Sequence, residues 1–106
     1  MEVSIVYVTF PSLSAAEDAA RRLVEARLAA CGNILPGMVS IYEWQGKLER
    51  AQEVVLLLKT RAALVSDLMV ELRALHPYDV PAILVLPVAG ADAAFAAWVG
   101  TQTRSP

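Results

Sequence analysis

The segment LHPYDVP, residues 75–81, contains the only histidine of the chain, followed directly by a proline and a tyrosine. A neutral imidazole is among the commonest protein ligands of copper and zinc, and it is also a frequent catalytic base. The residue before a proline disfavours the helical conformation, so His76 could equally mark the end of a helix. The sequence alone therefore leaves three roles open for His76: metal ligand, residue of a ligand-binding cleft, or structural residue.

A catalytic role has little support elsewhere in the chain. Hydrolysis by a nucleophile and a base needs a serine or cysteine beside the histidine, and no nucleophile-elbow motif occurs. The only cysteine, Cys31, follows the first predicted helix, where the helix dipole disfavours a thiolate, and such a cysteine is typically a small buried hydrophobe. It cannot form a disulfide within the chain, which fits a reducing cytoplasm. We expect a cytoplasmic protein that is not an enzyme.

Charge and hydropathy exclude two classes of partner. The net charge is −2 at pH 7, with nine basic residues scattered among eleven acidic ones, whereas nucleic-acid binding needs a clustered basic face. No apolar run approaches the roughly 18–20 residues that span a bilayer. The N-terminal MEVSIVYVTF lacks a basic segment and is typical of a strand rather than a signal peptide. We expect neither a nucleic-acid partner nor a membrane partner.

Seven predicted elements must position these residues, and the first two form a strand and a helix. Residues 3–10 are β-branched and aromatic, which is typical of a strand. Residues 12–30 carry an apolar stripe near the helical period. We expect a capping box between Ser14 and Glu17 at the start of this helix, and Gly32 just beyond its end.

A long hairpin is predicted next, over residues 34–60. Gln45 and Gly46 separate two strand-like runs and are typical of a two-residue turn. Pro36 and Gly37 interrupt the first run and predict a bulge or bend. Each arm should run for about ten residues, which is longer than a usual strand of about five or six.

The rest of the chain predicts a helix, a strand and a short last helix. We expect Thr60 to cap a helix over residues 61–75 that stops before Pro77. Residues 82–88 form an apolar strand, and Asp92 caps the last helix. The side chains that this helix should bury are Phe95, Trp98 and Val99.

The order β-α-β-β-α-β predicts a ferredoxin-like α+β fold, a four-stranded antiparallel sheet with two helices on one face, followed by the extra helix. At 106 residues the chain is one domain, residues 1–106. VVLLL at 54–58 and ILVL at 83–86 are apolar on both faces, although two helices cover only one face of such a sheet. We therefore predict an obligate homo-oligomer whose sheets pack together. The alternative is that the last helix folds over the second face.

Five blocks of sequence resemble one family in order along the chain. These blocks are RLAACGN (27–33), SIYEWQGKLE (40–49), LLKTR (57–61), LHPYDVP (75–81) and FAAWV (95–99). Together they resemble the CutA-type divalent-cation tolerance proteins over nearly the whole chain. The resemblance implies a cytoplasmic homotrimer of ferredoxin-like subunits with a role in tolerance of copper and other divalent metals.

The resemblance also carries over candidate metal ligands. His76 matches the histidine of the family before Pro-Tyr, and Cys31 matches its cysteine after Leu-Ala-Ala. Val8, Leu75 and Ala82 stand where some relatives have a further cysteine, a second histidine and an acidic residue. One histidine and one cysteine cannot complete a tetrahedral site, so neighbouring subunits or solvent must contribute. We expect weak binding of copper or another divalent cation through His76, with Cys31 and Asp79 as the other candidates.

A second hypothesis comes from the likeness of this trimer to PII-type signalling proteins, whose clefts between subunits bind small ligands. By that likeness the chain would sense a small anionic ligand. The candidate cleft residues are Tyr42, Trp44, Lys59, Arg61 and Tyr78, the two cations serving an anionic ligand. A third hypothesis is a trimeric scaffold for an unidentified protein partner.

Overall fold

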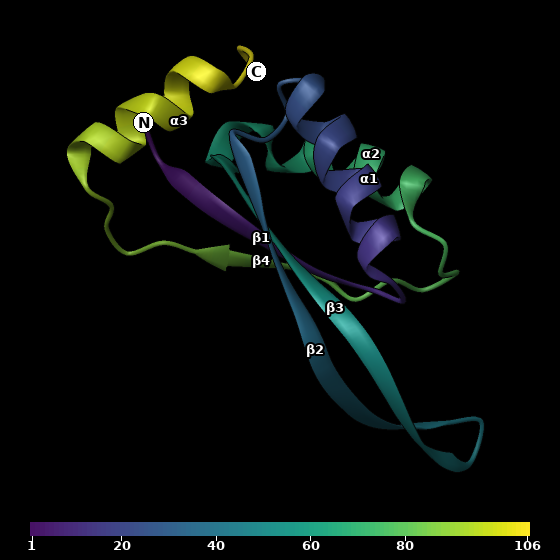
Figure 1. Cartoon of the computed structure of the whole chain (residues 1–106). Helices are drawn as coiled ribbons and strands as arrows, with labels where there is room; N and C mark the ends of the chain where they lie inside the picture. Colours follow the sequence, from purple (N-terminus) through teal and green to yellow (C-terminus); the bar gives the residue numbers. More distant parts are fainter.

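Four antiparallel strands and three helices make up the fold of this chain, described for all residues 1–106 in a computed structural model (Figure 1). The strands lie in the order β2-β3-β1-β4, which is the predicted ferredoxin-like α+β arrangement. In chain order the elements are β1 (Val3–Phe10), α1 (Leu13–Glu25), β2 (Cys31–Trp44), β3 (Lys47–Arg61), a 3₁₀ turn (Ala62–Leu64), α2 (Val65–Leu75), β4 (Ile83–Pro87) and α3 (Ala93–Gln102).

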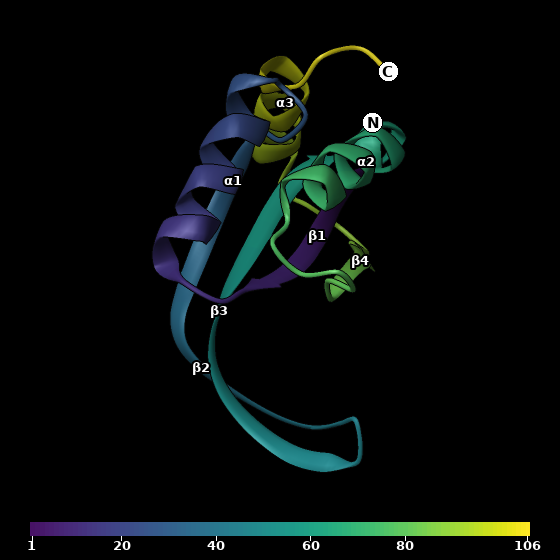
Figure 2. The same ribbon diagram turned by 90° about the vertical axis from the view of Figure 1, so that its right-hand side faces the viewer.

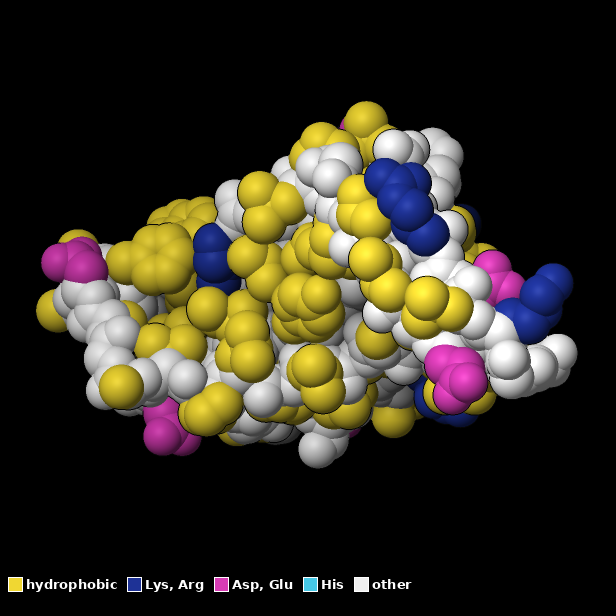
Figure 3. Space-filling model, turned by 90° about the horizontal axis from the view of Figure 1, so that it is seen from below, with side chains coloured by type: hydrophobic (Ala, Val, Ile, Leu, Met, Phe, Trp, Pro, Cys, Tyr) yellow, Lys and Arg dark blue, Asp and Glu magenta, His cyan; other side chains and the backbone are white.

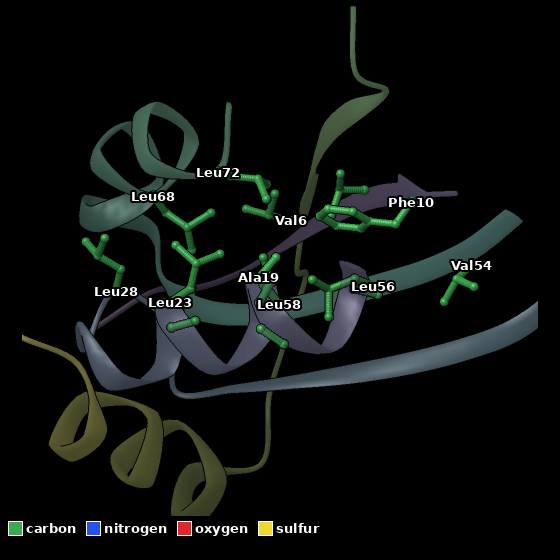
Figure 4. Close-up of a cluster of buried hydrophobic side chains, with 14 of the residues drawn as sticks. Val6, Phe10, Ala19, Leu23, Leu28, Val54, Leu56, Leu58, Leu68 and Leu72 are labelled. Carbon is green, nitrogen blue, oxygen red and sulfur yellow. The ribbon is translucent and has the colours of Figure 1, made fainter. Parts of the chain in front are cut away.

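The core lies between one face of the sheet and the two helices α1 and α2, which lie on the same side of it (Figure 2). Alternate residues of β1 and β3 enter this core because successive side chains of a strand point to opposite faces. Burying one large aliphatic or aromatic side chain contributes about 1.5–3 kcal/mol. Figure 4 shows the cluster, which includes Val6, Phe10, Leu23, Leu28, Leu56, Leu58, Leu68 and Leu72.

The ends of α1 differ from the prediction. Ser12, not Ser14, is the N-cap, because its Oγ accepts a hydrogen bond of 3.2 Å from the Ala15 amide. After the helix the chain reverses through Arg27, which adopts the left-handed conformation at φ 60°. Gly32 lies inside β2 instead, where a Cβ would come within 3.1 Å of the Leu56 side chain. Its missing side chain therefore permits close packing of α1 on the sheet.

The hairpin of β2 and β3 confirms both predicted irregularities. Gln45 and Gly46 have φ of 52° and 80° and form the two-residue turn, since a type I′ turn requires positive φ at both positions. The register shifts between Leu35 and Met38, which confirms the bulge. The arms contain 14 and 15 residues and project well beyond the helices (Figure 2). The radius of gyration is accordingly 14.4 Å, against about 13 Å for a compact chain of this length.

The second helix begins later than predicted. Thr60 is a residue of β3, not a helix cap, and its buried hydroxyl donates to the Leu28 carbonyl at 2.7 Å. A 3₁₀ turn then leads into α2, which begins at Val65. The predicted end is confirmed, because α2 stops at Leu75 and His76 has extended backbone angles before Pro77.

The last helix, α3, does not cover the second face of the sheet. Asp92 caps it as predicted, accepting from the Phe95 amide at 3.1 Å. Of the three side chains expected to be buried, only Val99 is buried, while Phe95 and Trp98 remain 38% and 42% exposed. The helix packs at one end of the sheet and leaves Leu84 and Leu86 exposed. From below, much of the visible surface is hydrophobic (Figure 3). None of the three helices combines the length and apolarity needed to cross a bilayer.

Candidate functional site

A well-formed hollow of the molecule lies where the hairpin, the end of β1 and the loop after α2 meet. It has a volume of about 500 Å³, within the range of roughly 300–1,000 Å³ of small-molecule sites. Tyr42 and Trp44 are two residues apart in β2, so they share one face of the ladder. The lining residues are Thr9, Tyr42, Trp44, Glu53, Pro77, Tyr78, Asp79, Val80 and Ala82.

The charge of this cleft is negative. Glu53 and Asp79 line it, and none of the lining residues is a lysine or arginine. The Tyr78 hydroxyl donates a hydrogen bond of 3.0 Å to Glu53 Oε2. Burial, that hydrogen bond and the nearby carboxylate raise the pKa of Tyr78 to about 12. Tyr78 is therefore neutral at physiological pH and continues to donate to Glu53, whose second oxygen is available to a ligand.

His76 lies behind the cleft wall and is buried. Its Nδ1 accepts a hydrogen bond of 3.1 Å from the Tyr78 amide, and its Nε2 lies 2.6 Å from the Thr9 carbonyl oxygen. Since the Tyr78 amide can only donate, the proton of the neutral ring must be on Nε2, which donates to Thr9. The ring also stacks on Phe10, with centroids 4.4 Å apart. Both ring nitrogens therefore already have partners.

Cys31 lies at the other end of the sheet. It pairs with Lys59, whereas Thr9, which contacts His76, pairs with Val55. The two partners are four positions apart in β3, or roughly 13 Å at about 3.3 Å per residue. Burial raises the pKa of the Cys31 thiol, and the Lys59 charge opposes this in part. The chain by itself brings no three of its histidine, cysteine and acidic side chains close enough to hold a metal ion.

Comparison with known proteins adds the family. The sequence profile described as CutA1 divalent ion tolerance protein matches residues 4–102. The chain belongs to this family. The Xenopus laevis CutA homolog is 47% identical over 92% of this chain and 65% of its own length. The Thermus thermophilus divalent-cation tolerance protein CutA is 44% identical over 93% of this chain and 96% of its own length. The Xylella fastidiosa CutA crystal structure aligns with a TM-score of 0.94 at 41% identity, covering 98% of this chain and 100% of that chain.

The length of the relatives differs between groups. The chain spans 56–65% of the length of the Xenopus, Arabidopsis, mouse and human relatives it matches, but nearly all of the Thermus protein. A similar structure from Archaeoglobus fulgidus, with a TM-score of 0.91 and 37% identity over 94% of this chain and 97% of that chain, is described as periplasmic. The compartment therefore does not follow from membership of the CutA family.

In this CutA-family chain the predicted cleft residues separate into two groups. Tyr42, Trp44 and Tyr78 line the same cleft. Lys59 and Arg61 do not, because Lys59 Nζ hydrogen-bonds Asn33 Oδ1 and Arg61 binds the end of α3. The predicted metal candidates also separate, since Asp79 lines the cleft, His76 lies behind it and Cys31 is remote.

Sequence reasoning missed Glu53. The signal that could have found it is the alternation of β3, which places Glu53 on the same face as Val55, away from the helices. The bulge then shifts the register, so that Glu53 pairs with Met38. The face of β2 that carries Tyr42 consequently borders the same cleft as Glu53. When the register of β2 and β3 is not known, Glu53 cannot be distinguished from an ordinary solvent-exposed residue of the hairpin.

Proposed function

We propose that this CutA-family chain serves divalent-cation tolerance as a homotrimer that binds divalent cations weakly in the acidic cleft. The observation that carries the proposal is the lining of the cleft, where Glu53 and Asp79 are the only charged residues. Arg73, which is not a lining residue, donates to the backbone oxygen of Asp79 and not to its carboxylate. The ligand bound at this site would be a divalent cation. The family, whose profile is described as a divalent ion tolerance protein, supplies the class of ligand.

The donor set suits a weakly held ion. Carboxylate oxygens bind hard and borderline divalent cations, while the tight soft sites of copper need imidazole or thiolate ligands. His76 has both nitrogens occupied, and the Cys31 thiol is harder to deprotonate than a free cysteine. Two carboxylates leave most of a coordination shell to water or to a neighbouring subunit. We therefore expect weak binding, with copper held more tightly than zinc, as the general affinity order of divalent metals predicts.

The alternative, a PII-like sensor of a small anionic ligand, is less favoured by this geometry. An anion in the cleft would meet two carboxylates, and the cations expected to bind it, Lys59 and Arg61, have partners elsewhere. A like charge at close range costs free energy, and more so in a partly desolvated site. An anionic ligand would need cations from a neighbouring subunit to offset this repulsion.

The homotrimer is supported by the apolar surface that the single chain leaves exposed. Leu84 and Leu86 on the open sheet face are 57% and 41% exposed, and Ile41 on the hairpin is 68% exposed. Contiguous apolar patches of this kind are rare on a monomeric protein and mark an interface. Analytical ultracentrifugation at micromolar concentration should give a trimer mass. A monomer would refute the assembly.

Three further expectations accompany the proposal. We expect no enzymatic activity, because the single histidine has both nitrogens engaged and cannot activate a nucleophile without leaving its place. We expect a reducing cytoplasmic location, on the basis of the lone cysteine, which cell fractionation would test against the periplasmic alternative. An unidentified protein partner remains a third hypothesis, for which an affinity pull-down is the measurement.

Isothermal titration calorimetry with zinc and copper tests the cation site directly. Glu53→Gln and Asp79→Asn remove one negative charge each with little change of shape, and each should weaken binding about tenfold, which corresponds to about 1.4 kcal/mol. Glu71→Gln is the matched control, because Glu71 is exposed on α2 outside the cleft. Affinities unchanged in both cleft variants, or lowered equally in the control, would refute this site.

A further inference from the structure

We infer that His76 is a positioning residue that fixes the wall of the cation cleft, rather than a ligand of the metal. The inference rests on the proposed cleft, but its first test does not require any metal to bind. It follows from what His76 connects. Thr9 and Tyr78 both line the cleft, one from the end of β1 and the other from the loop after α2. His76 hydrogen-bonds both of them and lies between the two segments.

A continuous set of contacts runs through this position. The Thr9 carbonyl accepts from Nε2 at 2.6 Å, Nδ1 accepts from the Tyr78 amide at 3.1 Å, and the Tyr78 hydroxyl reaches Glu53 Oε2 at 3.0 Å. The set therefore joins β1, the loop and β3. Because Asp79 directly follows Tyr78, the same contacts hold the backbone that carries the second acidic residue of the cleft.

Metal ligation through His76 would break this arrangement. A metal at Nε2 would displace the proton that binds Thr9, and a metal at Nδ1 would displace the Tyr78 amide. Either loss would leave a polar backbone group without its partner, at a site where the His76 side chain is buried against Phe10. Such unpaired groups are costly when they are shielded from water. A cation can bind the carboxylates of the cleft without this rearrangement.

Two substitutions separate the polar contacts from simple packing. The Nδ1 contact spans two residues, from the side chain of residue 76 to the amide of residue 78, which is the geometry of an Asx turn. His76→Asn can therefore restore the loop contact with a side-chain oxygen. His76→Phe keeps an aromatic ring against Phe10 but offers no acceptor. Both variants lose the donor to Thr9. They differ at the Tyr78 amide, which only His76→Asn can bind, and in the ring against Phe10, which only His76→Phe keeps, so a packing role predicts the opposite order of the two variants.

The first experiment uses nuclear magnetic resonance on the ¹⁵N-labelled full chain without metal. Because His76 is the only histidine, its ring signals are unambiguous, and we expect the Nε2–H tautomer. Hydrogen exchange of the Tyr78 amide should be slow in the wild type and in His76→Asn, and at least tenfold faster in His76→Phe. The Val6 amide in the central strand β1 reports that each variant is folded. The Nδ1–H tautomer, or equal exchange at Tyr78 in all three proteins, would overturn the inference.

The second experiment adds zinc to the same samples. A positioning role predicts that the His76 ring nitrogens keep their chemical shifts, that His76→Asn binds zinc within about threefold of the wild type, and that His76→Phe binds about tenfold more weakly. A shift of a ring nitrogen on zinc addition would show that His76 is a ligand, and equal loss of affinity in both variants would refute positioning through the Tyr78 amide. Absence of zinc binding in the wild type would refute the proposed function, while the metal-free results would still decide the role of His76.

Discussion

β3 pairs with β1 over residues 54–61, and the charged side chains at or next to the two ends of this stretch are used in opposite ways. At the end near α3, Arg61 Nη2 donates to the Gly100 carbonyl at 2.6 Å, and Nε donates to Thr103 Oγ1 at 2.9 Å. At the cleft end, Glu53 receives one hydrogen bond from Tyr78. Asp79 also lines the cleft, and its backbone oxygen accepts a hydrogen bond of 3.4 Å from Arg73. The end near α3, called the paired end below, holds charged groups whose hydrogen bonds are made within the protein. The carboxylates at the cleft end can accept further hydrogen bonds.

This difference shows how a charge that serves the fold can be told from one that is still available to a ligand. A charge whose donors are taken up by backbone carbonyls stabilises the fold and has little left for a ligand. A carboxylate that lines a cavity with unused oxygens costs free energy of desolvation unless something positive approaches it. Arg61 and Glu53 look alike in the sequence, as charged residues of one long strand. Only the partners that the fold provides distinguish them.

The largest predicted effect is at the paired end. Arg61→Ala should lower the free energy of unfolding by about 2–3 kcal/mol, because hydrogen bonds to a charged group contribute about 1.5–3 kcal/mol and carbonyls at the end of α3 lose their donor. Denaturant unfolding measures the change, with the exposed Arg21→Ala as control. Zinc affinity at the cleft should stay unchanged. A loss below 1 kcal/mol would show that Val99 packing, rather than Arg61, holds α3 in place.

The next effect concerns packing at the same end. A Cβ at Gly32 would lie 3.1 Å from Leu56 Cδ1 and 3.2 Å from Ala20 Cβ. Gly32→Ala should therefore destabilise the chain by about 1–2 kcal/mol, since overpacking forces side chains or backbone to shift. Gly90→Ala is the matched control, because a Cβ there meets nothing within 4 Å. Equal free energies of unfolding for Gly32→Ala and Gly90→Ala would mean that β2 can move away from α1 without cost. The paired end would then be less tightly packed than expected.

At the cleft end, the contribution of Tyr78 to stability depends on pH. The pKa of Tyr78 is about 12 in the folded chain and about 10 when unfolded. Below pH 10 the Tyr78 hydroxyl is protonated in both the folded and the unfolded chain, and its contribution to stability is fully present. Above pH 10 the unfolded state loses the proton first, so stability falls, and the contribution is lost as pH passes 12.

Tyr78→Phe should remove this slope and lower the free energy of unfolding at pH 7 by about 1 kcal/mol, through loss of the hydrogen bond to Glu53. Urea unfolding of both proteins between pH 8 and pH 11 gives the difference in their free energies of unfolding at each pH. Residues that titrate in both proteins contribute equally and cancel in this difference. Parallel curves for the two proteins would mean that the hydroxyl is free in solution and that Glu53 is not held by Tyr78.

The sequence predicted best those features that short-range chemistry determines. The turn at Gln45-Gly46 and the helix stop before Pro77 follow from the backbone preferences of two or three residues. The caps were less predictable, because Ser12 and Ser14 are chemically equivalent and only the docking of α1 selects between them. The cleft was predictable only in part. Tyr78 was found from its motif, but Glu53 depends on a bulge that sets the register over a long hairpin, and no local pattern encodes which partner it faces.

The smallest expected effect is a change in the reactivity of the Cys31 thiol, at the paired end, rather than a change in stability. Burial raises the pKa of Cys31, and Lys59 lowers it by a smaller amount. Lys59→Met removes the opposing charge, so the thiol should become still harder to deprotonate. Because the thiolate is the nucleophile, alkylation by iodoacetamide at pH 8 should slow by a few-fold, and the midpoint of its pH profile should rise. A faster reaction would mean that Lys59 holds β2 against β3 through Asn33, and that exposure rather than charge controls this thiol.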